Sequence, residues 1–136
     1  MEFEVELRKN GLKNTPHRTK ILELLESYDE PVTAKDIYES LKENKVYISL
    51  STVYRTLDKL VELDFVRKLT FVGEDSSLFE SIRKGHRHYL VCLKCKKKTV
   101  INKCPIKGYH EVLERETNFA IEGHKLAIYG YCPMCK

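Results

Sequence analysis

Four of the five cysteines occur as two Cys-x-x-Cys pairs, and this spacing is the strongest chemical signal in the 136-residue sequence. The pairs are Cys92 with Cys95 and Cys132 with Cys135. A turn of this kind places two thiolates on one metal ion, and two such turns supply the tetrahedral four-sulfur set that zinc prefers. The alternatives are redox-active or merely buried cysteines, or iron in place of zinc. The spacing favours a structural Zn²⁺ held by all four cysteines.

A second group of metal-binding side chains precedes the first cysteine pair. His86 and His88 are two residues apart, so in an extended chain their imidazoles point to one face and can hold one metal. His124, eight residues before Cys132, is a possible third ligand. An isolated histidine is usually a surface or hydrogen-bonded side chain, but the clustering here predicts a second metal site. Further donors in the sequence nearby are Cys104, Glu80, His110 and Glu111.

Basic side chains gather locally in the half of the chain that is acidic overall. Residues 1–83 contain 13 Lys and Arg against 16 Asp and Glu, whereas residues 84–136 contain 11 against 4. The net charge of +4 therefore does not locate a nucleic-acid surface. Residues 8–20 nevertheless contain no acid and five Lys or Arg, a composition suited to phosphate contacts.

Residues 51–55 have the composition of the start of a DNA-recognition helix, because they offer hydroxyls, a phenol and a guanidinium within about one turn. For any single residue an ordinary solvated face is the alternative interpretation. The DNA contacts expected from both stretches are Lys13, Thr15, Arg18, Ser51, Thr52, Tyr54 and Arg55.

The elements that must position these residues are helical in the first half of the chain. Thr15 and Pro16 predict a helix start, and this helix ends near residue 28. Thr33 and Asp36 form a capping-box pattern that opens the next helix, and Ser51 is the expected cap of a third. Residues 65–72 and a return strand from residue 78 then predict a β-hairpin. Helices followed by a hairpin indicate a winged helix-turn-helix domain.

The second half is predicted to be mostly strands. A polar stretch at residues 81–85 is the expected hinge, giving a domain of residues 1–83 and another of residues 84–136. The second domain is expected to contain strands at 88–91 and 98–102, a helix opened by Pro105 and running to about Thr117, and a long strand at 119–131. The predicted fold class is α+β.

Composition excludes several other classes of protein. No apolar run approaches the ~18–20 residues needed to span a bilayer, and the first ten residues carry no signal-peptide pattern. We therefore expect a cytoplasmic protein with no membrane partner, in which cysteines bind metal rather than form disulfides. The sequence contains no P-loop, dinucleotide-binding motif or Ser-His-Asp arrangement, so we expect no enzyme activity.

Taken together, the motifs resemble the ferric uptake regulator (Fur) superfamily of bacterial metal-dependent repressors. The resemblance covers essentially the whole chain in order, and it is strongest in the Thr-Val-Tyr-Arg helix combined with the His-x-His-x-x-x-Cys-x-x-Cys motif. The matching stretches are residues 11–18, 33–38, 51–57, 86–95, and 124 with 129–132.

The resemblance implies an N-terminal winged helix and a small C-terminal α/β dimerisation domain with structural zinc. It also implies a homodimer that binds a double-stranded DNA operator, with a corepressor metal setting the angle between the DNA-binding domains. The four paired cysteines match the family's structural zinc site. His86, His88 and His124 match its ligand set in the dimerisation domain.

Departures from the family pattern bear on the sensed metal. The hinge site of the family commonly uses a histidine from the loop where this chain has Glu-Pro-Val at residues 30–32. It also uses two histidines at the positions that Arg87 and Tyr89 occupy here. Only Glu80 has the residue type expected of a hinge-site ligand. The missing hinge histidine argues against peroxide sensing by histidine oxidation. A carboxylate common early in the dimerisation helix aligns with Lys107, and Cys104 lies about one helical turn earlier.

We therefore hypothesise a regulatory site made of His86, His88, His124 and Cys104, in which the sulfur favours Zn²⁺ over Fe²⁺ or Mn²⁺. The expected function is a repressor of metal-uptake genes for zinc or iron. The competing hypotheses are a zinc-ribbon adaptor that binds protein and a thiol redox switch, neither of which binds DNA.

Overall fold

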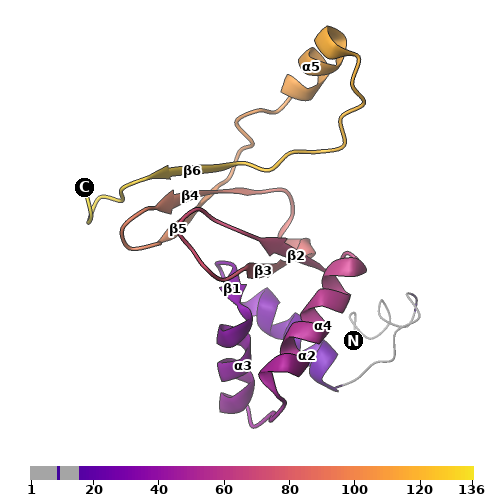
Figure 1. Ribbon diagram of the computed structural model, residues 1–136, viewed down its shortest axis with the longest axis vertical. Coiled ribbons are helices and arrows are strands. Elements are labelled where there is room, and N and C mark those ends of the chain that lie inside the picture. The colour runs from indigo at the N-terminus through magenta and orange to yellow at the C-terminus, as the bar shows by residue number, and fades with distance from the viewer. Residues whose placement is uncertain (1–8, 10–15) are drawn as a thin grey trace. The chain divides into compact units, whose positions relative to one another are not determined.

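The computed structural model describes Lys9 and residues 16–136, and the chain divides into two compact units, Met1–Lys84 and Gly85–Lys136 (Figure 1). The sequence-based boundary, after Arg83, differs from this division by one residue. Lys13 and Thr15, including the helix cap expected at Thr15, lie outside the described residues. No helix in the described part of the chain is both long enough and apolar enough to cross a bilayer.

The described residues of the N-terminal unit form three α-helices, a three-stranded antiparallel sheet and a short 3-10 helix, η1 (Ile82–Lys84). The helices are α2 (Pro16–Ser27), α3 (Ala34–Glu43) and α4 (Leu50–Glu62). The sheet has the strand order β1 (Val32–Thr33), β3 (Leu78–Ser81), β2 (Val66–Leu69). The expected hairpin is β2 with β3, and the two-residue β1, which the sequence did not predict, pairs with the outer edge of β3. This is the helix and hairpin order of a winged helix.

Side-chain caps determine where α3 and α4 begin. The predicted capping box of α3 is present, since Asp36 N donates to Thr33 Oγ1 at 3.0 Å and Thr33 N donates to Asp36 Oδ2 at 3.1 Å. The cap predicted for α4 was wrong. Ser49, in an extended conformation, accepts from Thr52 N at 3.1 Å, so that Ser51 already lies inside the first turn. A cap must precede the helix and accept from its third residue, and only Ser49 satisfies both conditions.

The core of the N-terminal unit is formed by the apolar positions that recur at helical spacing. Each of the three helices contributes side chains that are at most 1% exposed, and Phe79 of β3 packs with them. Packing of these faces therefore fixes α4 against α3 and the sheet, leaving its opposite face toward solvent. The helical core residues are Ile21, Leu22, Leu25, Ala34, Ile37, Leu41, Val53, Leu57 and Leu60.

The C-terminal unit contains a three-stranded sheet and one helix. Its strand order is β5 (Lys98–Ile101), β4 (His88–Cys92), β6 (Ala127–Gly130), with β5 antiparallel and β6 parallel to β4. Helix α5 (Tyr109–Thr117) lies between β5 and β6 in sequence and stands away from that sheet in Figure 1. None of its residues is buried by the chain itself.

Two elements of the C-terminal unit differ from the sequence-based expectation. The helix expected from Pro105 begins at Tyr109, because Gly108 has a φ of +85°, a conformation that interrupts the helix. The long strand expected at 119–131 is reduced to Ala127–Gly130. Its partner β4 has only five residues, and residues 118–126 pair with no strand in the described part of the chain. Both changes matter, because Cys104 and His124 therefore lie in non-repetitive segments.

Candidate metal centres

The four paired cysteines meet at one end of the C-terminal sheet, and we call them the four-cysteine cluster. Cys92 is the last residue of β4, and the other pair follows β6, the strand parallel to it. The four sulfur atoms lie within 4.8 Å of one another. The Sγ atoms of Cys95 and Cys132 are 3.8 Å apart, the S–S edge of about 3.8 Å that Zn–S bonds of about 2.3 Å require in a tetrahedron.

Backbone amides already stabilise negative charge in this cluster. The N–H groups of Cys132 and Cys95 point at Cys92 Sγ at 3.4 and 3.5 Å, and these contacts lower the pKa of the Cys92 thiol to about 5. The neighbouring thiols have the opposite effect on Cys135, because a hydrogen bond with Cys132 and burial raise its pKa to about 12. Four thiols this close cannot all ionise without a cation among them, and a bound divalent metal ion would supply that charge.

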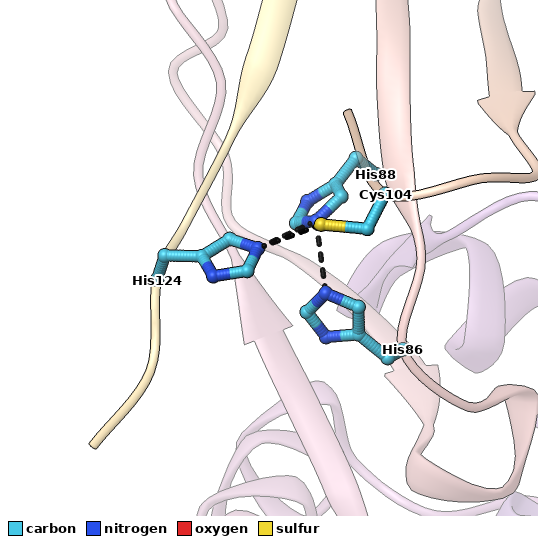
Figure 2. Close-up of side chains that lie close together, drawn as sticks. All are labelled: His86, His88, Cys104 and His124. Carbon is cyan, nitrogen blue, oxygen red and sulfur yellow. Dashed lines mark hydrogen bonds between the residues drawn. The ribbon is translucent and has the colours of Figure 1, made fainter. Parts of the chain in front are cut away.

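Three histidines and one cysteine form a second group, the histidine–cysteine cluster (Figure 2). His86 precedes β4, His88 begins it, Cys104 lies in the turns before α5, and His124 lies in the segment before β6. His88 Nε2 is 3.0 Å from His86 Nε2 and 2.9 Å from His124 Nε2, and Cys104 Sγ is 3.2 Å from His124 Nε2. Three segments far apart in sequence thus bring four donor atoms to one point.

The donor set of this cluster fits a tetrahedral metal. All four donor atoms lie within 4.8 Å of one another, and Zn–N bonds of about 2.0–2.1 Å imply N–N edges of about 3.3 Å, close to the two Nε2 separations. Burial lowers the pKa of His124, and the neighbouring imidazoles of His88, His110 and His86 lower it further. A lowered pKa favours the neutral imidazole, which is the form that ligates a metal.

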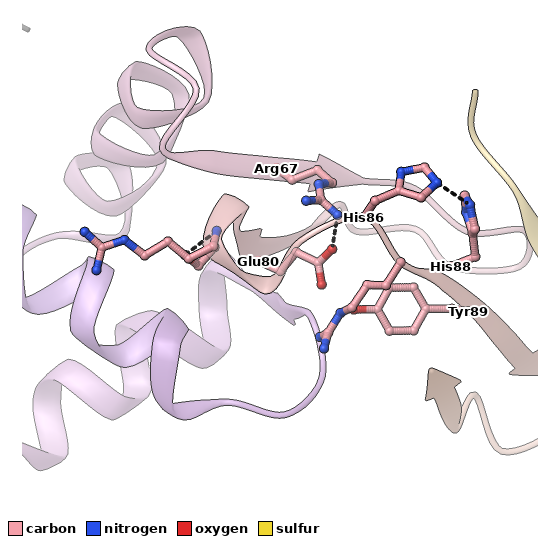
Figure 3. Close-up of polar contacts among 8 residues, drawn as sticks. Arg67, Glu80, His86, His88 and Tyr89 are labelled. Atoms are coloured by element: carbon pink, nitrogen blue, oxygen red, sulfur yellow. Dashed lines mark hydrogen bonds and ion pairs between the residues drawn. The ribbon is translucent and has the colours of Figure 1, made fainter. Parts of the chain in front are cut away.

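Glu80 forms an ion pair within the N-terminal unit and is not a member of either cluster. Its carboxylate is 2% exposed and accepts a hydrogen bond from Arg67 Nη1 at 2.9 Å, across the β2–β3 ladder where the two residues are register partners (Figure 3). Arg67 is not among the site residues predicted from the sequence, although the hairpin register pairs it with Glu80. In the C-terminal unit, Arg87 Nε donates to Tyr89 Oη at 2.8 Å.

The expected DNA-binding residues of α4 lie on its solvent face. Ser51, Tyr54 and Arg55 are exposed, whereas Val53 and Leu57 of the same helix point into the core. Thr52 is half-buried and takes part in the cap, and Arg55 Nη2 donates to its hydroxyl at 3.2 Å. Arg18 is half-buried in the first turn of α2. The helix therefore presents a phenol and a guanidinium from its first two turns.

Comparisons with known proteins agree with this architecture. The family model described as the ferric uptake regulator family matches residues 9–129. The ferric uptake regulation protein of Bacillus subtilis is 34% identical over 134 residues, which cover 96% of this chain and 89% of that protein. The peroxide-responsive repressor PerR of Staphylococcus epidermidis is 32% identical over 96% of this chain and 85% of its own length. The crystal structure of the Vibrio cholerae ferric uptake regulator has a TM-score of 0.81 at 31% identity, covering 95% of this chain and 98% of that one.

Proposed function

The chain belongs to the ferric uptake regulator family, and on that premise we propose that it is a zinc-responsive transcriptional repressor that binds operator DNA as a homodimer. In this proposal the four-cysteine cluster holds a structural Zn²⁺, and the histidine–cysteine cluster holds the corepressor metal. A regulator of this kind acts on chromosomal DNA, so the proposal includes a cytoplasmic location.

The observation that carries the proposal is the convergence of the histidine–cysteine cluster. Its four donor atoms come from three segments and lie within 4.8 Å of one another. His86 directly follows Gly85, the first residue of the C-terminal unit, so the cluster begins where the chain leaves the DNA-binding unit. A metal bound here would hold the start of the C-terminal unit to Cys104 and His124. It would thereby restrict the orientation of the winged helices.

The ligand types support zinc as the sensed metal. A thiolate sulfur beside three imidazoles is a softer set than the carboxylate and imidazole sites that suit manganese and ferrous iron. His88 is buried, with 4% of its surface exposed, whereas His86 is exposed. One side of the cluster is therefore open for metal entry. We infer that Zn²⁺ is preferred over Fe²⁺ and Mn²⁺.

The DNA-binding part of the proposal rests on α4 and on the basic stretch at residues 8–20. Tyr54 and Arg55 project from the solvent face of α4, the second helix of the helix-turn-helix, while its other face is fixed in the core. The N-terminal unit is acidic overall, so it would not attract DNA through a general positive field. The basic residues of the stretch at 8–20 would instead contact individual phosphates. Indiscriminate DNA binding is thereby limited.

The homodimer is supported by apolar side chains that the single chain leaves exposed. Leu90 of β4 and Ile128 of β6 are register partners on adjacent strands, and each is 44% exposed. Tyr109 of α5 and Phe119 beyond it are 48% and 72% exposed. A helix with no buried residue and an uncovered sheet face are typical of surfaces that a second subunit covers.

Binding measurements with one metal at a time test the proposal. A random DNA duplex pool is first selected with the zinc-loaded protein, and the selected duplex is then titrated by fluorescence anisotropy with Zn²⁺, Fe²⁺ or Mn²⁺. We expect Zn²⁺ to strengthen binding at the lowest free-metal concentration, by about 5- to 150-fold, the usual range of coupling between sites. DNA affinity that no divalent metal changes would contradict the proposal.

A further inference from the structure

The two ring nitrogens of His124 face different partners. Its Nε2 points into the histidine–cysteine cluster, 2.9 Å from His88 Nε2 and 3.2 Å from Cys104 Sγ. Its Nδ1 points the other way, 2.7 Å from Nε2 of His110, and the two rings meet nearly edge to face, with centroids 4.8 Å apart. His110 is therefore outside the cluster, next to one of its ligands.

This arrangement determines which nitrogen of His124 is available for a metal. An imidazole that ligates through Nε2 carries its proton on Nδ1, and that N–H needs an acceptor. His110 Nε2 lies at hydrogen-bond distance from His124 Nδ1. It can accept this N–H when His110 carries its own proton on Nδ1. With both protons so placed, the lone pair of His124 Nε2 points at the other donors.

We propose that His110 is a positioning residue for the histidine–cysteine cluster: it accepts the Nδ1–H of His124 and fixes both the tautomer and the ring orientation of that ligand. This inference rests on the proposed function of the cluster as a metal site. It differs from an assignment of His110 as a ligand, because His110 Nε2 faces the outer nitrogen of His124 and is not among the four converging donors.

Helix α5 is well suited to hold His124 in this way. His110 lies in the first turn of α5, and Glu114 lies one turn further on the same helix face. Glu114 Oε2 accepts a hydrogen bond from the backbone N–H of Ile121 at 3.1 Å. Two side chains of the helix thus contact the segment that carries His124. Glu114 contacts the backbone of that segment, and His110 contacts the ring of His124. Loss of His110 would remove the ring contact and leave the backbone contact in place.

Three variants separate hydrogen bonding from packing. His110→Gln keeps an acceptor, since its Oε1 can reach a position close to that of Nε2, whereas His110→Leu keeps the volume and offers no acceptor. Glu111→Gln is the matched control, because Glu111 is the next residue of the same helix and is exposed. Co²⁺ is the probe, titrated into the full-length protein that retains zinc in the four-cysteine cluster. A competing chelator gives the affinity, and the visible absorption reports the coordination geometry.

We expect His110→Leu to bind Co²⁺ about 10- to 100-fold more weakly, the range measured for outer partners of metal ligands, while His110→Gln and Glu111→Gln stay much closer to the parent protein. In ¹⁵N–¹H spectra of the zinc-loaded protein, His124 should show a slowly exchanging Nδ1 proton that His110→Leu loses and His110→Gln retains. Unchanged Co²⁺ affinity in His110→Leu, or equal losses in the Leu and Gln variants, would overturn the inference.

The same titration distinguishes this inference from the proposed function. If the parent cluster binds Co²⁺ tightly, depends on His110 and yet leaves DNA affinity unchanged, the proposed switch fails and the role of His110 stands. If the parent cluster binds no Co²⁺, both are wrong.

Discussion

The Sγ atom of Cys104 lies 3.2 Å from Nε2 of His124, although the two residues are separated by 20 positions in the sequence. The chain between them consists of the turn at residues 105–108, helix α5 and the non-repetitive segment after it. This contact closes a loop whose helix has no fully buried residue within its own subunit. A metal shared by these two residues would fix the ends of that loop, and α5 with them, at the cost of a modest loop-closure entropy.

Replacement of Cys104 by serine is expected to disable the histidine–cysteine cluster selectively. A hydroxyl is a harder and much weaker ligand than a thiolate. Loss of a partner that only hydrogen-bonds to a ligand already lowers metal affinity by up to roughly 100-fold, so loss of the Cys104 thiolate should lower zinc affinity at this site by more than that. Chelator competition with Zn²⁺ measures the change. The zinc in the four-cysteine cluster should remain at one equivalent per chain, and an unchanged second equivalent would show that Cys104 is not a ligand.

Removal of the zinc proposed for the four-cysteine cluster should unfold the C-terminal unit and spare the N-terminal one. The C-terminal unit is small, and structural zinc contributes about 10–16 kcal/mol of binding free energy in comparably small zinc-finger peptides. Hydrogen exchange of Cys95→Ser should therefore show loss of protection in β4 to β6 and retained protection in α3 and α4. Met134→Ser is the control, because Met134 lies within the second Cys-x-x-Cys turn and is 92% exposed. Retained protection in β4 of the zinc-free variant would refute the assignment.

The Arg67–Glu80 pair is expected to stabilise the N-terminal unit far more than a surface ion pair does. Glu80 is buried, so Arg67→Met leaves a buried carboxylate without this partner, which typically costs about 3–5 kcal/mol. The exposed pair Lys59–Glu62, at 3.7 Å, supplies the comparison, and Lys59→Met should cost under about 1 kcal/mol. Urea unfolding followed by circular dichroism measures both free energies. Equal costs would mean that the buried pair has no special role.

Substitutions on the solvent face of α4 should weaken DNA binding without unfolding the unit. Arg55→Ala is expected to reduce affinity by about 1–3 kcal/mol if the guanidinium reads a base edge, or to lower the salt dependence by about one unit if it contacts phosphate. Tyr54→Ala should also weaken binding, because its phenol is on the same exposed face. Lys103→Ala removes an exposed charge from the C-terminal unit and should leave affinity almost unchanged. Wild-type affinity in both α4 variants would exclude this face as the contact surface.

Much of this architecture could be predicted because it depends on local patterns. Core residues such as Ile37, Leu41 and Leu57 recur at helical spacing, and a Thr33–Asp36 capping box is a purely local signal. The cap of α4 was misassigned because Ser49 and Ser51 are both good caps by type, and only the observed chain path distinguishes them.

The remaining errors concern residues whose conformation depends on distant partners. The strand expected at 119–131 is limited by the length of β4, which no local pattern around His124 reveals. Similarly, the place of His110 beside His124 depends on how α5 and the following segment fold back. The family resemblance already grouped the four donors of the histidine–cysteine cluster, whereas the separations between their donor atoms depend on the tertiary fold.

Reciprocal coupling between zinc and DNA is the most direct test of a repressor switched by its histidine–cysteine cluster. If zinc strengthens DNA binding, then DNA must strengthen zinc binding at that cluster by the same factor. Chelator competition therefore measures the zinc affinity of the second site with and without saturating selected duplex. We predict an increase of about 5- to 150-fold with DNA, matching the effect of zinc on DNA affinity and absent in Cys104→Ser. Equal zinc affinities with and without DNA would contradict the account.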